Sequence, residues 1–326
     1  MCKVLRKTLA IIFSVVVAAP LLAMGGVALY DTIAFNDYYK NSEKLYKIPG
    51  INDGYIPQGL AYSKKYDVFL NTGYMKKSSD ASRIYISKED GSDMKFVSLK
   101  YKDELFTKHN GGIGVHGEMA YISTASKLYS LSMKDLVNAN NGDYVNILGE
   151  QKVHTNSSFC FASDSMMYVG EFCDDGKYKV DETHHIKNGD QEHHALVLAY
   201  PFIGDIVSPL PQFGYSVLDC AQGMCITDSN KIVISTSRGL DASKLVSYKV
   251  NANTKMSLFK NDDFLIPVVI SFLGTNELVN EIKGPAMNEE IEYKDGYIYV
   301  NNESACNKYI FGKFTRAKYI YRIKAQ

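Results

Sequence analysis

The chain has 326 residues, 46% of them hydrophobic, which is enough for a globular core in one large domain or two ordinary ones. Lys and Arg together number 36, as do Asp and Glu, so the chain lacks the basic excess with which nucleic-acid-binding proteins hold the phosphate backbone. Tyr is abundant at 24 residues and Trp is absent, a composition that favours half-buried strands over helices.

The first segment is apolar and is preceded by basic residues. Lys3, Arg6 and Lys7 come before residues 8–30, which contain no charged residue and are long enough to cross a membrane as one helix. The basic residues predict a cytoplasmic N-terminus, with everything after Asp31 exported. Small residues at 23–25 suit signal peptidase, so residues 1–30 are a signal anchor or a cleaved signal peptide. The apolar run continues past that point, which favours the anchor.

Residues 31–42 are predicted to be a linker, and residues 43–326 the exported domain. An odd number of cysteines in the exported part excludes a complete set of intramolecular disulfides, and no spacing matches a zinc knuckle. We therefore expect mostly buried thiols. These cysteines are Cys160, Cys173, Cys220, Cys225 and Cys306.

One pattern recurs along the exported domain. Each copy opens with a small or amide residue, often Gly, followed by an apolar pair, a tight turn and an alternating strand, and a third strand follows. The copies open at residues 57–60, 110–113, 157–160, 221–224 and 288–291. Antiparallel strands repeating about every 50 residues are typical of β-propeller blades.

The two ends of this domain are predicted to close a ring. The last copy ends after its third strand, at residues 319–323, while residues 43–48 form a strand with no blade of its own. We predict that residues 43–48 add the outer strand of the last blade and so remove an exposed sheet edge. The expected fold is all-β: a five-bladed β-propeller, or a six-bladed one if Asp263 to Ile282 holds a degenerate copy.

A histidine-rich segment, Asp181 to His194, is inserted within the third copy. Its two imidazole pairs, His184-His185 and His193-His194, could bind a transition metal together with nearby side-chain oxygens. However, the segment is charged and lacks apolar spacing, so a solvated surface loop is the favoured interpretation.

No motif in the chain predicts a catalytic residue. Residues 112–117 match the dinucleotide-binding fingerprint by letter, but a strand follows them rather than the helix that would receive the pyrophosphate. Nucleophile-elbow, zinc-protease and phosphate-loop motifs do not occur in the sequence.

Several short sequence motifs resemble motifs of known propeller proteins. Pro57-Gln58-Gly59-Leu60 and Ala221-Gln222-Gly223-Met224 resemble the phrase that opens a blade in the SMP-30/gluconolactonase and strictosidine-synthase superfamily. Three further motifs, at residues 109–113, 168–172 and 293–299, occur in an order that resembles the order in a group of uncharacterised exported propellers from Gram-positive bacteria. The resemblance covers Leu45 to Ile323 and implies a propeller fold and export. The lactonase branch holds a divalent metal in its channel, but here Gln58 and Gln222 stand where an acid would be expected.

Equivalent positions of different blades lie around the axis of a propeller, so polar residues at these positions should form one mouth of its channel. We predict that this mouth binds a small molecule, a glycan or a protein. The predicted ligand-binding residues are Gln58, His109, Asn110, Glu171, Gln222, Arg238, Glu289 and Asn302.

Two other interpretations of the same residues stay open. In a metal-dependent hydrolase of the lactonase or esterase type, Glu289, Glu171 and Asn110 would hold an ion, and calcium suits such oxygens. In a purely structural protein, the polar groups would hydrate the channel, and Glu171 would pair with Arg238. In each case we expect a monomer that is tethered to the extracellular side of the cell membrane or secreted.

Overall fold

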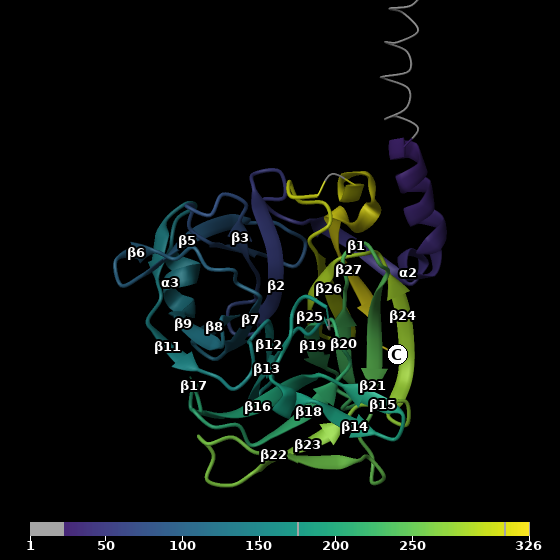
Figure 1. Ribbon diagram of the computed structural model, residues 1–326. Coiled ribbons are helices and arrows are strands. Elements are labelled where there is room, and N and C mark those ends of the chain that lie inside the picture. Colours follow the sequence, from purple (N-terminus) through teal and green to yellow (C-terminus); the bar gives the residue numbers. More distant parts are fainter. Residues whose placement is uncertain (1–22, 175, 310, 326) are drawn as a thin grey trace, which may run out of the picture.

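The computed structural model describes residues 23–174, 176–309 and 311–325. Residues 23–34 are helical, and helix α2 (Asn36–Lys40) follows them beside the sheets (Figure 1). Among the described residues no helix has the length and apolarity needed to cross a membrane. The predicted anchor lies mainly in residues 1–22, outside the described residues.

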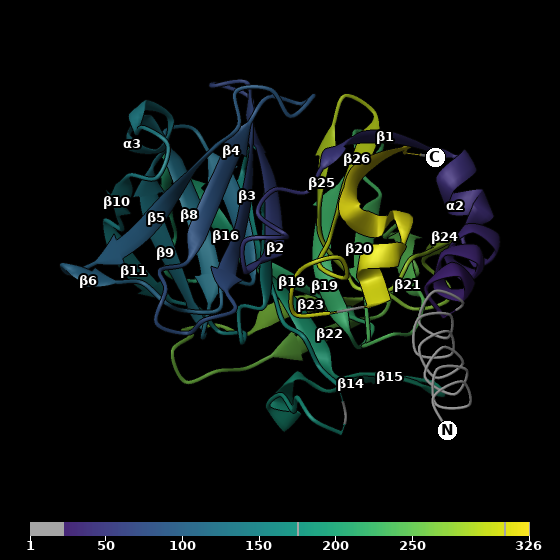
Figure 2. The same ribbon diagram turned by 90° about the horizontal axis from the view of Figure 1, so that it is seen from above.

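The described strands form five sheets of four or more strands each, arranged around a centre (Figures 1 and 2). In the first sheet the order is β10-β5-β4-β3-β2, with β6 on β5. The bounds are β2 (Tyr55–Ser63), β3 (Val68–Met75), β4 (Arg83–Ser87), β5 (Lys95–Tyr101), β6 (Glu104–Leu105) and β10 (Tyr144–Asn146). The second sheet contains β7 (Gly112–His116), β8 (Met119–Thr124), β9 (Lys127–Ser132) and β11 (Gly149–Lys152), and helix α3 (Met133–Asn138) follows β9.

The third sheet has the order β12-β13-β16-β18-β23-β22, with β17 on β16. The bounds are β12 (Phe159–Ala162), β13 (Met166–Gly170), β16 (Ala195–Ile203), β17 (Ile206–Val207), β18 (Phe213–Val217), β22 (Met256–Phe259) and β23 (Val268–Phe272). The fourth sheet contains β19 (Ala221–Ile226), β20 (Ile232–Thr236), β21 (Ser243–Tyr248) and β24 (Leu278–Gly284). The fifth has the order β1-β27-β26-β25, with β1 (Ser42–Lys47), β25 (Asn288–Lys294), β26 (Tyr297–Asn302) and β27 (Tyr319–Lys324).

One strand of each sheet lies innermost, and these are β2, β7, β12, β19 and β25. β2 packs against β7, β7 against β12, β12 against β19, β19 against β25, and β25 returns to β2. Such a closed cycle of inner strands is a propeller arrangement. The core lies between adjacent sheets: for example, Leu70 and Ile84 of the first sheet belong to one buried cluster with Ile113 and Ile122 of the second.

The predicted closing strand is confirmed. β1 pairs antiparallel with β27, with Ser42 opposite Ile323 and Lys44 opposite Tyr321. The strand nearest the N-terminus therefore completes the sheet built by the C-terminus, because β27 would otherwise present an unpaired edge.

Residues 263–282, predicted as a degenerate blade in the six-bladed alternative, instead contribute to two sheets. β23 pairs in parallel with β18, and β24 pairs antiparallel with β21. β23 is added to the third sheet and β24 to the fourth, and the inner strands of both sheets come from earlier in the chain.

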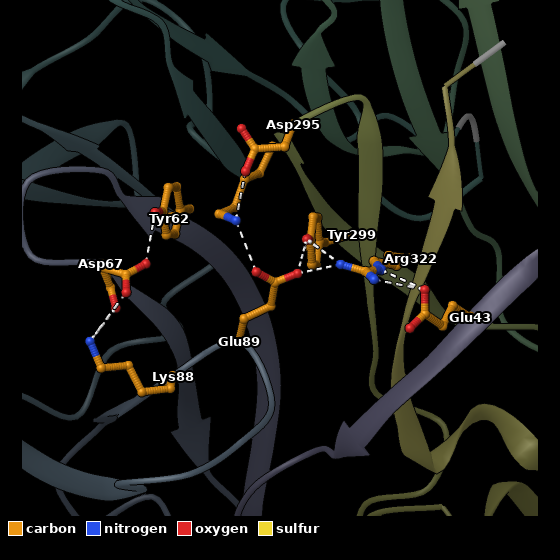
Figure 3. A network of polar contacts seen from close by, with 9 residues as sticks. Glu43, Tyr62, Asp67, Lys88, Glu89, Asp295, Tyr299 and Arg322 are labelled. Carbon is orange, nitrogen blue, oxygen red and sulfur yellow. Dashed lines mark hydrogen bonds and ion pairs between the residues drawn. The ribbon is translucent and has the colours of Figure 1, made fainter.

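A polar network joins the first and last sheets (Figure 3). Glu89, after β4, accepts hydrogen bonds from Lys294 at 2.8 Å, from the Tyr299 hydroxyl and from Arg322. Arg322 also pairs with Glu43 of β1 at 2.8 Å. Although burial opposes ionisation, the hydrogen bonds from Lys294 and Tyr299 lower the pKa of Glu89. Ion pairs between the first and fifth sheets therefore hold the two ends of the ring together, in addition to the pairing of β1 with β27.

Four of the five described cysteines are buried and Cys220 is partly exposed, as expected for buried thiols. No disulfide joins them in the part of the chain that the structure describes.

The prediction of a solvated surface loop at Asp181 to His194 is wrong in part. The segment is an insertion between β13 and β16, as expected, but it forms a 3₁₀ turn (Glu182–His184) and a hairpin of β14 (Ile186–Asn188) and β15 (Gln191–His193). His184 and His193 are each only 8% exposed. His193, on β15, stacks on Phe272, and His184, in the 3₁₀ turn, contacts the buried Glu171.

Candidate functional site

The predicted binding residues of the inner strands lie where three of those strands are bulged. The register of strand pairing shifts between Pro57 and Gly59, between Ala221 and Gly223, and between Asn288 and Ile291. Gln58, Gln222 and Glu289 are the predicted residues inside these shifts. A bulge redirects side chains and is common near the rim of a closed sheet and beside binding sites. We call the end of the channel where the inner strands begin the leading mouth.

At the leading mouth a chain of polar contacts joins residues distant in sequence. The amide of Gln58 donates to Glu303 at 2.9 Å, while its oxygen lies 2.9 Å from Nε2 of His109. Glu303 also accepts a hydrogen bond from the Tyr309 hydroxyl at 2.9 Å. The His109 ring lies edge-on to Tyr74, with centroids 4.2 Å apart. Gln58 and His109 therefore meet as predicted, and Glu303, Tyr309 and Tyr74 join them.

Glu289 lies beside this chain as a buried acid. Its side chain is only 2% exposed, and no described residue donates a hydrogen bond to its carboxylate. Burial, followed by the negative charge of Glu303, raises the pKa of Glu289 well above its usual value, although Lys308 opposes this shift. Burial also raises the pKa of Glu303. Burial and the charge of Lys308 lower the pKa of His109 to about 4, so this imidazole is neutral at pH 7.

Other predicted site residues have structural partners. Glu171 accepts hydrogen bonds from Nδ1 of His184 at 2.7 Å and from the backbone of Leu196 at 2.9 Å. Arg238 is largely exposed and pairs with Asp174 at 3.0 Å rather than with Glu171.

The two predicted asparagines are buried. Asn302 donates to Ala286 and Asn288 and accepts from Ser304, so it organises the turn after β26. Asn110 reaches back to the first sheet, where it donates to Thr72 at 3.3 Å, and its side-chain oxygen has no partner among the described residues. Gln222 is partly buried on β19.

The axis of the ring is filled by a residue that no sequence motif indicated. Glu290 is fully buried, and its carboxylate accepts backbone hydrogen bonds from Leu60 at 2.8 Å, from Ile113 at 2.9 Å and from Cys160 at 2.9 Å. These three donors belong to β2, β7 and β12, whose inner edges face the axis. One side chain from β25 thus replaces the strand partner that three inner strands lack. Burial raises the pKa of Glu290 and the three backbone donors lower it, with burial the larger effect.

Three glycines of the repeat lie close to Glu290 or to the backbone beside it. A Cβ at Gly59 would lie 2.9 Å from Oε2 of Glu290, and one at Gly223 would lie 2.6 Å from its Cα. A Cβ at Gly112 would overlap Oε1 of Glu290. Glycine at positions 59 and 112 therefore leaves room for the Glu290 carboxylate, and Gly223 leaves room for the backbone of β25.

A large cavity lies at the opposite end of the channel from the predicted mouth. It has a volume of about 1210 Å³ and is lined by residues where the inner strands end, together with the turns that follow them. We call it the trailing cavity. Its aromatic lining residues are Tyr62, Phe161, Tyr168, Tyr215 and Tyr293.

Glu292 contributes a buried acid to the trailing cavity. It is 8% exposed and accepts backbone hydrogen bonds from Tyr62 at 3.1 Å and from Tyr293 at 2.8 Å. Burial raises the pKa of Glu292 to about 8, against the effect of these two donors. A carboxyl group that changes protonation near neutral pH in a concave site is typical of functional sites.

One sequence signal could have identified Glu290 and Glu292 as buried acids with a special role. Residues 289–292 read Glu-Glu-Ile-Glu at the start of an inner strand, where the other copies have no acid. Three acids within four residues of a buried strand require dedicated partners, because a buried charge is costly when it is unpaired.

The comparisons with known proteins show little likeness. No family model and no curated protein matches the chain. An oxidoreductase (glucose dehydrogenase) from Thermus thermophilus is 11% identical with a TM-score of 0.42, over 86% of this chain and 99% of that one. The PQQ-bound aldose sugar dehydrogenase of Streptomyces coelicolor is 10% identical with a TM-score of 0.40, over 86% and 96%. BamB from Moraxella catarrhalis is 9% identical with a TM-score of 0.35, over 82% and 83%.

Proposed function

We propose that the chain is a five-bladed, ligand-binding β-propeller, exported and tethered by its N-terminal apolar segment, that takes a glycan or a similar polyhydroxylated small molecule in the trailing cavity. The cavity, with its aromatic lining and the Glu292 carboxyl group, is the single observation that carries the proposal. The cycle of five inner strands supports the blade count, since each of these strands is the innermost strand of one sheet of four or more strands.

The chemistry of the cavity suits this ligand class. Tyrosine presents a flat apolar face, on which a sugar ring can lie, and a hydroxyl group that can bond to sugar hydroxyls. Charged groups at the rim, such as Lys249 and Asp228, add further donors and acceptors. A mostly preformed concave site with a few polar groups is where a propeller would hold a small ligand.

Removing one aromatic wall of the cavity should weaken binding. We expect Tyr293→Ala to bind a ligand found by a glycan and metabolite thermal-shift screen at least about tenfold more weakly, because loss of a stacked aromatic surface costs roughly 1.4 kcal/mol or more. Tyr144→Ala is the control: this residue is 55% exposed on β10 and is not a lining residue of the cavity. Titration calorimetry measures both. Equal affinity in wild type and Tyr293→Ala, or no ligand in the screen, would contradict the proposal.

A second candidate function follows from Glu289, whose buried carboxylate receives no hydrogen bond from a described residue. With Glu303 it offers hard oxygens of the kind that bind calcium, which is the ion the metal-dependent hydrolase alternative requires. Asn110 and Glu171, the other predicted ligands, make structural contacts instead, so we propose the ion between Glu289 and Glu303.

Calcium binding at the leading mouth should depend on Glu289 and on pH. We expect Glu289→Gln to weaken calcium binding at least about tenfold, since one of two charged ligands is lost. Affinity should rise with pH, because burial raises the pKa of both acids and the ion must displace their protons. Glu281→Gln, on the exposed strand β24, is the control. If calorimetry finds no calcium binding, or the same calcium affinity in Glu289→Gln and Glu281→Gln, the metal-dependent hydrolase alternative is contradicted.

A further inference from the structure

The hairpin of β14 and β15 brings two imidazoles together on one side. Ile186 lies opposite His193 in the register, so His185 and His194 lie opposite each other at the next position. Their ring centroids are 4.6 Å apart. His193 points to the other side, where it stacks on Phe272. Since side chains alternate along a strand, Glu192 and His194 flank His193 on the opposite side from that contact.

Three ligand atoms converge there. One donor atom from each of His185, Glu192 and His194 lies within 4.8 Å of the other two, close enough for one ion after small side-chain rotations. Glu192 forms only an exposed pair with Lys187 at 3.3 Å, which is worth little and can be exchanged for a metal. His185 and His194 are partly exposed, so both an ion and a water ligand can reach the site.

Asp219 fixes the orientation of His194. Nδ1 of His194 lies 2.7 Å from Oδ2 of Asp219, and Oδ1 of the same carboxylate accepts the backbone N–H of His194 at 3.2 Å. When Nδ1 carries the proton and donates to Asp219, Nε2 keeps its lone pair for a metal. Histidines that bind zinc usually donate their other ring N–H to a carboxylate or carbonyl in this way.

We propose that His185, Glu192 and His194 form a binding site for a divalent transition metal such as zinc, with Asp219 as the positioning residue behind His194. Two imidazoles, one carboxylate and an open position for water are an arrangement that zinc accepts. Cys173, His194 and Asp219 form a second group with donor atoms within 4.8 Å of one another. We favour the first group because Cys173 is only 3% exposed and Asp219 already holds His194 in place.

Zinc and cobalt titrations of the chelator-treated, full-length protein test this site. We expect one metal ion per chain, at least about tenfold weaker binding in His185→Ala and in Glu192→Gln, and about tenfold weaker binding in Asp219→Asn with unchanged stoichiometry. His116→Ala is the matched control, because His116 stacks on Phe202 in another part of the ring. Circular dichroism checks that each variant is folded.

The visible spectrum of bound cobalt identifies the ligands. Coordination by nitrogen and oxygen alone, with unchanged binding in Cys173→Ser, supports the proposal. A sulfur-to-cobalt charge-transfer band that disappears in Cys173→Ser would overturn this ligand set in favour of the group with Cys173. Absence of zinc and cobalt binding in the wild type, or equal binding in His185→Ala, would overturn the site.

Discussion

Replacing Glu290 by alanine is expected to lower the free energy of unfolding by roughly 3 to 9 kcal/mol, the largest effect of any single substitution proposed for this ring. Three buried backbone N–H groups, those of Leu60, Ile113 and Cys160, would lose the Glu290 carboxylate as their acceptor, and each unpaired group costs roughly 1 to 3 kcal/mol. Urea unfolding of wild type and variant measures the difference.

Two comparisons make this result specific. Glu281→Ala, on an exposed part of β24, should change stability by no more than about 0.5 kcal/mol. Gly112→Ala should also destabilise the ring, because the added Cβ would press against the carboxylate of Glu290. A loss below about 1 kcal/mol in Glu290→Ala would show that the carboxylate is not the common acceptor of three strands.

The second large effect is a fall in stability as pH rises, caused by Glu292. Burial raises the pKa of Glu292 from 4.5 to about 8, so between these pH values the folded state holds a proton that the unfolded state has released. The stability from this group is therefore fully present below about pH 4.5 and is lost as pH approaches 8. At about 1.4 kcal/mol per pKa unit, the change is on the order of 4 to 5 kcal/mol.

Glu292→Gln isolates this contribution. The variant cannot titrate at this position, so wild type should lose stability relative to the variant between pH 5 and pH 8, as measured by urea unfolding at several pH values. The comparison is needed because His109 acts in the opposite direction: burial lowers its pKa to about 4, so its contribution is lost as pH falls from 6.5. A constant difference between wild type and Glu292→Gln across this range would contradict the raised pKa.

The site was less predictable than the ring. Gln58, His109 and Glu289 were predicted at one mouth and do lie there, because equivalent positions of a repeat take equivalent places around an axis. Tyr309 comes from a loop that has no counterpart in the repeat, so alignment could not place it. Glu171 was predicted at the mouth, but its partner His184 belongs to an insertion, and only the folded insertion shows that the two meet.

The sequence by itself determined the all-β repeat, its hairpins and the closing strand at residues 43–48, because alternation, turn residues and strand propensity act within a few residues. Only the tertiary structure decided what fills the centre. Glu290 reaches donors on three strands that lie at least 130 positions away in the chain, and its carboxylate lies beside Gly59 and Gly112. The Gly that recurs among the copies is therefore both a local signal and, at positions 59, 112 and 223, a packing requirement set by the distant strand β25.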